Sequence, residues 1–132
     1  MTTFTKKKKK RSNNRWLAVQ YQLQQVAQSY RMSTLVLADD MGLLVSAADS
    51  HYNSDAVAAF CPLEGKPIKP YVKDGIQRAM TSDCAPTPPR LTVQRFSVNG
   101  SELFLAGAGK EQRANPAGLS RAMKGVSRIL ST

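Results

Sequence analysis

Two almost continuously apolar segments joined by a short turn constrain this chain more than any other feature. The segments Thr34–Ala38 and Leu43–Ala47 flank Asp39-Asp40-Met41-Gly42, where Gly42 can supply the positive φ angle that closes a tight turn. Strands this apolar cannot leave one face of their sheet in water. We therefore expect a hairpin in a sheet that is covered on both faces or paired with another subunit.

A second hairpin is predicted by Asn99-Gly100, a strong signal for a two-residue turn. It stands between two strand-like segments, Leu91–Val98 and Ser101–Ala108. The apolar positions of the first segment change phase near Gln94-Arg95, which indicates either a bulge or a change of packed face.

Apolar residues at helical spacing predict a first helix from Trp16 to Tyr30, with its N-cap among Ser12, Asn13 and Asn14. Its other side is polar but uncharged, which suits either solvent or a partner. That side consists of Gln20, Gln22, Gln24, Gln25 and Gln28.

Two further helices are predicted, one in the middle of the chain and one at its end. A short alanine-rich helix should run from Asp55 to Phe60, with Ser54 as its N-cap and Pro62 as its stop. The last helix should have Asn115 as its N-cap and Pro116 in its first turn, and apolar residues recur after them at helical spacing.

Residues 62–90 hold six of the seven prolines, so this segment should be mostly irregular. Its one periodic piece, from Val72 to Met80, forms a short helix or continues the previous helix after a break. The expected order is therefore helix, hairpin, helix, irregular segment, hairpin and helix.

The charge is concentrated at the N-terminus of a chain whose 132 residues suit a single domain. Residues 1–15 carry +7 without an acidic residue, whereas residues 16–132 carry only +3. We expect a disordered basic tail at 1–13 and one domain at 14–132. The tail could bind nucleic acid, a membrane surface or another polyanion weakly. Its basic residues are Lys6, Lys7, Lys8, Lys9, Lys10 and Arg11.

The sequence also predicts the cellular location of the protein and the redox state of its two thiols. No apolar run approaches the roughly 20 residues of a transmembrane helix, and no apolar signal-peptide core follows the first charges, so a cytoplasmic protein is expected. Cys61 and Cys84 are too few for a disulfide framework or a four-ligand zinc site and should be reduced.

Residues with catalytic chemistry are sparse. His51 is the single histidine, Cys61 lies at an apolar helix end, and Cys84 has no obvious activating base. The run Gly107-Ala108-Gly109-Lys110 lacks two residues of a phosphate-binding Walker loop, so its glycines turn the strand toward the last helix or form an anion nest. We therefore expect a non-enzymatic protein without a metal or cofactor.

The hairpin and the order of elements resemble Roadblock-type domains. In that family an apolar strand ends in a D-x-x-G turn, as at Leu35–Gly42 here, and an alanine-rich helix follows, as at Val57–Phe60. The resemblance covers about residues 14–131. It implies an α/β fold in which helices sandwich a single antiparallel sheet, a profilin-like architecture. Four strands are recognised here where the family has five. The proline-rich segment at 62–90 stands where the family continues its second helix and enters a third strand, so a fifth strand within 62–90 stays open.

The resemblance also implies a function. In Roadblock-type domains the second helix and the neighbouring strand edge pair across a two-fold axis, and the dimer regulates or supports Ras-like small GTPases, motor complexes or polarity complexes. A homodimer with such a partner is therefore expected here. The interface residues carried by the second helix would be Tyr52, Asp55, Val57, Ala58 and Phe60.

Two other functions stay open. A small-ligand sensory domain of similar shape would need an apolar pocket between sheet and helices, lined by residues such as Phe96, Phe104 and Met123. A nucleic-acid or anionic-surface binder would act through the lysine tail, although residues 16–132 lack exposed aromatics interleaved with basic residues.

Overall fold

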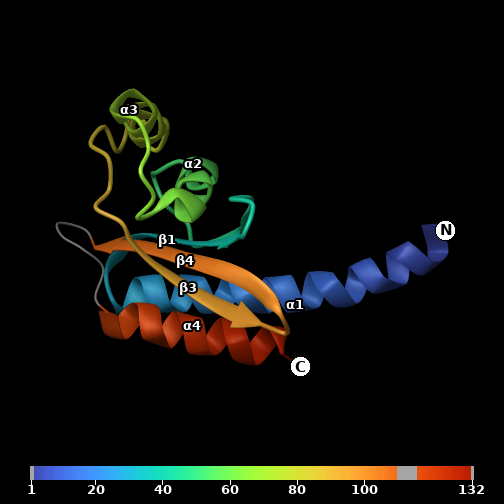
Figure 1. Cartoon of the computed structure of the whole chain (residues 1–132). Coiled ribbons are helices and arrows are strands. Elements are labelled where there is room, and N and C mark those ends of the chain that lie inside the picture. Colours follow the sequence, from blue (N-terminus) through green and yellow to red (C-terminus); the bar gives the residue numbers. More distant parts are fainter. Residues whose placement is uncertain (1, 110–115, 132) are drawn as a thin grey trace.

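A computed structural model describes residues 2–109 and 116–131, with side chains described from Asn14 onward. Within these residues a single four-stranded antiparallel sheet lies between two layers of helices (Figure 1), which confirms the expected α/β sandwich. The elements in chain order are α1 (Thr2–Ser29), β1 (Met32–Asp39), β2 (Leu44–Ala47), α2 (Ser54–Phe60), the 3₁₀ turn η1 (Cys61–Leu63), α3 (Pro70–Ala79), β3 (Thr92–Val98), β4 (Ser101–Gly109) and α4 (Pro116–Leu130).

The strand order is β2-β1-β4-β3, so the two predicted hairpins lie side by side. Strands β1 and β4 form the centre and pair from Asp39 opposite Leu103 to Met32 opposite Gly109. Both central strands are almost entirely buried, whereas β2 is half-exposed because it is an edge strand. The expectation of complete cover therefore holds for the first strand of the hairpin and not for the second.

Asp39 holds the turn between β1 and β2. Its Oδ1 accepts hydrogen bonds from the backbone N–H groups of Met41 and Leu43, at 2.9 and 3.0 Å. Gly42 has the predicted positive φ, +81°. A Cβ at this position would also lie 3.3 Å from the Cα of Ala59 in α2. Glycine is therefore needed both for the turn and for the close approach of α2.

The second hairpin has the predicted two-residue turn, with φ angles of +51° at Asn99 and +81° at Gly100. These angles belong to the type I′ turn that matches the twist of paired strands. The Asn99 side chain donates through Nδ2 to the carbonyl oxygen of Leu130, at 3.2 Å. The turn therefore caps the C-terminal end of α4 and fixes that helix to the sheet.

Strand β3 changes its packed face without a bulge. It pairs with β4 in unbroken register from Thr92 to Val98. Val93 packs on the α2 side of the sheet, whereas Phe96 and Val98 pack on the side of α1 and α4. Of the two interpretations of the phase change, the bulge is wrong and the change of face is correct.

Helix α1 begins earlier than the sequence indicated. It starts at Thr2, whereas a disordered tail was expected at 1–13. The segment before Asn14 contains neither proline nor glycine, and lysine is a good helix former, so a helix fixed by packing further on can continue backward through it. The predicted N-caps at 12–14 lie inside the helix, and that prediction is wrong.

Helices α1 and α4 cover one face of the sheet and bury most of its large apolar side chains. The two helices approach closely because a Cβ at Gly125 would overlap the side chain of Gln22. Gln24 of α1 also exchanges two hydrogen bonds of 2.8 Å with Asp49, just after β2. Two glutamines of the polar side are therefore used inside the fold. The core of this layer includes Val19, Leu23, Val26, Leu35, Leu37, Leu105, Leu119 and Val126.

The other face is covered by α2 and η1, with α3 beyond α2 (Figure 1). Asn53, not Ser54, is the N-cap of α2, since its Oδ1 accepts from the backbone N–H groups of Asp55 and Ala56, at 3.1 and 3.4 Å. The chain continues past Phe60 into η1, which includes Pro62. The periodic piece after it is a separate helix, α3, which has no buried residue.

Candidate partner interface

The inner side of α2 and η1 packs against the sheet of its own chain. Val57, Ala58 and Cys61 pack against the sheet around Val36 and Phe104. The Cys61 thiol donates to the carbonyl oxygen of Val57, at 3.4 Å. Burial raises the pKa of this thiol from 9.0 to about 12. Cys61 is therefore a protonated core residue at neutral pH and no nucleophile.

The five residues predicted for the dimer interface divide between core and surface. Val57 and Ala58 have no exposed surface, whereas Asp55 is exposed, and Tyr52 and Phe60 are half-buried. A seven-residue helix has only one apolar stripe with which to attach to the sheet, and that stripe faces inward. Val57 and Ala58 are therefore removed from the candidate surface, which keeps the other three.

Phe60 lines a groove of about 590 Å³ between the end of α2, α3 and the beginning of β3. Leu91 and Val93 add further apolar surface, and both are half-buried. Glu64 and Lys73 supply charges of opposite sign to the same groove. Sequence reasoning missed this groove, although Leu91 and Val93 are the residues whose phase differed from the rest of β3.

Strand β3 is an edge strand that begins at this groove. Among the described strands it pairs only with β4, so its other edge can accept a further strand. The Arg95 guanidinium lies 5.3 Å from the centroid of the Phe104 ring, and its Nε lies 3.6 Å from Glu102 Oε1. The side chains of Arg95 and Glu102 are 59% and 41% exposed, so the ion pair between them is weak.

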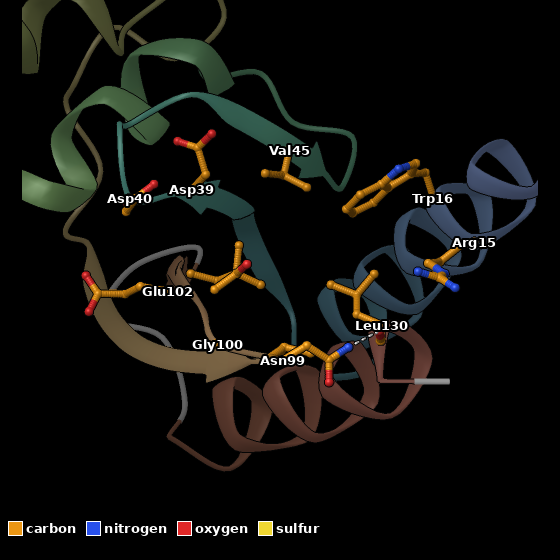
Figure 2. A pocket seen from close by; sticks show the side chains of 12 residues that line it. Arg15, Trp16, Asp39, Asp40, Val45, Asn99, Gly100, Glu102 and Leu130 are labelled. Atoms are coloured by element: carbon orange, nitrogen blue, oxygen red, sulfur yellow. Dashed lines mark hydrogen bonds between the residues drawn. The ribbon is translucent and has the colours of Figure 1, made fainter. Parts of the chain in front are cut away.

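A second hollow, of about 730 Å³, lies where both hairpin turns meet α1 (Figure 2). Figure 2 shows Asp39, Asp40 and Glu102 on one side of the view and Trp16 and Arg15 on the other. The Asp39 carboxylate already accepts two backbone hydrogen bonds within its own turn. In the described part of the chain, no group of three or more metal-ligating side chains comes together, here or elsewhere.

The residues suggested for a small-ligand pocket do not meet. Phe104 belongs to the core on the α2 side of the sheet. Phe96 and Met123 pack on the opposite face, under α1 and α4. The sheet itself separates them, so these three residues cannot line one pocket.

The other residues considered for catalysis or phosphate binding are His51, Cys84 and the glycines near the end of β4. His51 is exposed, and its carbonyl oxygen accepts a hydrogen bond from the Ser82 hydroxyl. Cys84 is exposed and lines a shallow hollow with His51, of about 650 Å³. Gly107 and Gly109 lie within β4 and pair with β1, so they form neither a turn to the last helix nor a phosphate loop. Lys110 and Asn115 fall outside the described residues.

Comparisons with known proteins bear on the fold. No protein-family model matches the chain, and no curated protein matches it by sequence. The structure is similar to that of MglB from Myxococcus xanthus, with a TM-score of 0.52, over 88% of this chain and 86% of that chain, at 12% sequence identity. The fold is Roadblock-like. The resemblance predicted from the hairpin and the element order is therefore confirmed at the level of fold.

The proline-rich segment between α2 and β3 is where the sequence left the existence of a fifth strand open. Four strands form the sheet in the described residues, and the segment between α2 and β3 contains the helix α3. Proline has no N–H group to donate to a strand ladder, which disfavours a strand there. Pro70 instead begins α3, where its missing N–H costs nothing. Strand β3, which follows this segment, is an edge strand of the sheet.

None of the helices in the described part of the chain combines the length and the apolar character needed to cross a bilayer.

Proposed function

We propose that this chain is a non-enzymatic regulatory or scaffolding module that acts in the cytoplasm as a homodimer and binds a Ras-like small GTPase or a polarity or motor complex. The observation that supports this function is the Roadblock-like fold. The similarity to MglB, a Roadblock-like polarity regulator, extends over 88% of the chain.

In this proposal the dimer forms through the outer side of α2 and the edge of β3. The β3 edge can pair with its symmetry mate across a two-fold axis. The adjoining groove adds half-buried apolar surface from Phe60, Leu91 and Val93. Asp55 and Tyr52 lie at the N-terminal end of α2 and would border the interface.

Sedimentation of the full chain tests the homodimer. At micromolar concentration we expect twice the chain mass of 14.5 kDa. Ala59 is exposed on α2, so Ala59→Arg should give a folded monomer. Gln28→Arg, at an exposed position of α1 in the other helix layer, is the matched control and should stay dimeric. A wild-type chain that is monomeric at every concentration would exclude this mode of action.

Affinity capture tests the partner separately. The full chain is used to recover proteins from its native source in the presence of GDP or a non-hydrolysable GTP analogue. We expect a small GTPase whose recovery depends on the nucleotide. Recovery of a copurifying metabolite without any GTPase would support the sensory alternative instead.

A further inference from the structure

Helix α1 is strongly basic and extends beyond the sheet. Residues 2–29 hold five lysines and two arginines and no acidic residue. The buried core positions of this helix begin at Val19, and Figure 1 shows the N-terminal part projecting past the sheet. At 1.5 Å per residue a helix of 28 residues is about 42 Å long. A positive segment is therefore carried on a helix at a distance from the folded body.

Large apolar side chains are exposed on α1 directly after this basic segment. Leu17 is 62% exposed and Tyr21 is 69% exposed. They stand one helical turn apart and therefore share one side of the helix. Val19 and Leu23, one turn apart as well, are fully buried on another side. The fold of this chain thus leaves the side with Leu17 and Tyr21 uncovered.

This exposed side is directed away from the acidic hollow. Trp16, 38% exposed, lines the hollow that also contains Asp40 and Glu102 (Figure 2). At about 100° per residue, Leu17 and Tyr21 project about 100° and 140° around the helix from Trp16. Their side of α1 can therefore approach a negatively charged surface without bringing these carboxylates to it.

We infer that the exposed side of α1 binds the surface of an anionic membrane. The basic segment at Lys6–Arg11 supplies attraction to acidic headgroups, and Leu17 and Tyr21 supply apolar and aromatic side chains that enter the interface. Tyrosine favours the headgroup level of a bilayer, and leucine favours the acyl boundary. Nucleic acid would share the charge attraction, but leucine has no flat face on which a base can stack. The combination therefore favours lipid.

The inference rests on the pairing of an apolar side with a basic helix, because single exposed apolar residues are common on protein surfaces. Tyr71 of α3 provides the comparison within the same chain. It is 70% exposed, almost the same as Tyr21, but α3 also contains the acidic Asp74 and does not continue a run of lysines. Exposure alone therefore predicts equal behaviour of the two tyrosines, whereas the inference predicts different behaviour.

Co-sedimentation of the full chain with vesicles tests the inference. The probes are vesicles of phosphatidylcholine alone and of phosphatidylcholine with about one-third phosphatidylserine, at low and at near-physiological salt. We expect binding to the mixed vesicles only. Leu17→Ser with Tyr21→Ser should weaken that binding about tenfold at the higher salt, where screening reduces the charge contribution. Replacing Lys6–Lys10 by glutamine should abolish it at both salts.

Tyr71→Ser is the matched control and should bind as the wild type does. Three results would overturn the inference: no binding of the wild type to the mixed vesicles, equal binding by wild type and the Leu17/Tyr21 variant, or loss of binding in Tyr71→Ser. Displacement from vesicles by a small amount of DNA would assign the helix to nucleic acid instead. Since vesicle binding is measured without a GTPase, it can fail or succeed independently of the proposed function.

Discussion

The two faces of the sheet are covered very differently. On one face lie α1 and α4, of 28 and 15 residues, and they bury leucines and valines from both helices and both central strands. On the other face lie α2, of seven residues, and η1, and much of the buried surface there comes from alanine and valine. Apolar burial is the main favourable term in folding, so the first face carries most of the stability.

Surfaces that the chain leaves uncovered are also found on the α2 side of the sheet. The groove at Phe60, the β3 edge and the wholly exposed or half-exposed α3 lie beside or beyond α2. A protein can place a partner surface only where its own core does not need the side chains. The comparison therefore separates the face that contributes most of the stability from the face that carries the proposed dimer surface.

The largest expected effect comes from a charge placed under α2. Val57 is fully buried, so Val57→Asp puts a carboxylate in the core with no partner. We expect a loss of about 4 kcal/mol or more in the free energy of unfolding, enough to unfold much of the protein at room temperature. Far-UV circular dichroism and chemical denaturation would measure it.

Ala59→Asp provides the control for that substitution on the same helix, with both variants measured at a concentration at which the chain is monomeric, because Ala59 lies on the proposed dimer surface. Ala59 is exposed, so its carboxylate stays in water, and the unfavourable position near the end of α2 should cost less than about 1 kcal/mol. If Val57→Asp were as stable as Ala59→Asp, α2 would not be attached to the sheet through Val57, and the described packing of this face would be wrong.

Truncation of one leucine on each face sharpens the comparison. Leu105 is fully buried under α1 and α4, whereas Leu91 is half-buried beside the groove on the α2 side. Leu105→Ala should lower the free energy of unfolding by about 3 kcal/mol, and Leu91→Ala by about 1 kcal/mol. Urea denaturation at a fixed protein concentration measures both. Equal losses would show that the two faces contribute alike.

Local patterns predicted the parts of the fold that depend on local chemistry. Gly42 and Asn99-Gly100 were found because positive φ angles are a property of the residue itself. The change of packed face in β3 was readable from the phase of its apolar residues. The sequence did not reveal where α1 begins. A lysine-rich composition favours disorder, but a helix can also propagate backward from a packed segment, and the two effects compete.

The candidate interface was harder to predict, because it depends on which side chains are buried in the fold. An alanine-rich helix suits close approach by any neighbour, and the sequence does not say whether that neighbour is the chain's own sheet or a second copy. For Val57 and Ala58 the neighbour is the sheet. The pair of glycines in α4, Gly118 and Gly125, did carry a signal for close approach of α4 to its neighbours, since they stand seven residues apart on the buried stripe.

Replacing a glycine by valine compares the turn between β3 and β4, which contacts α4, with the exposed helix α3. A Cβ added at Gly100 or at Gly75 would meet no atom within 4 Å, so neither substitution creates a clash. The two differ in backbone conformation, because Gly100 has a φ of +81°. Gly100→Val should therefore cost about 2 kcal/mol, whereas Gly75→Val should change stability by only a few tenths. Thermal melts of both variants measure the difference, and an unchanged melt for Gly100→Val would contradict the turn.

The smallest effect concerns the two cysteines, one under α2 and one on the surface. Cys84 is exposed and should react with iodoacetamide under native conditions, whereas buried Cys61 should react only after unfolding. Burial raises the folded-state pKa of Cys61 from 9.0 to about 12, so its contribution to stability is complete below pH 9 and declines as the pH rises toward 12. By pH 10 the loss should be about 1.4 kcal/mol. Cys61→Ala should show a correspondingly shallower decline between pH 8 and 10, because tyrosine and lysine titration remains in both proteins. Identical pH profiles for the wild type and Cys61→Ala, with rapid native labelling of both thiols, would mean that α2 opens too readily to keep this face dry.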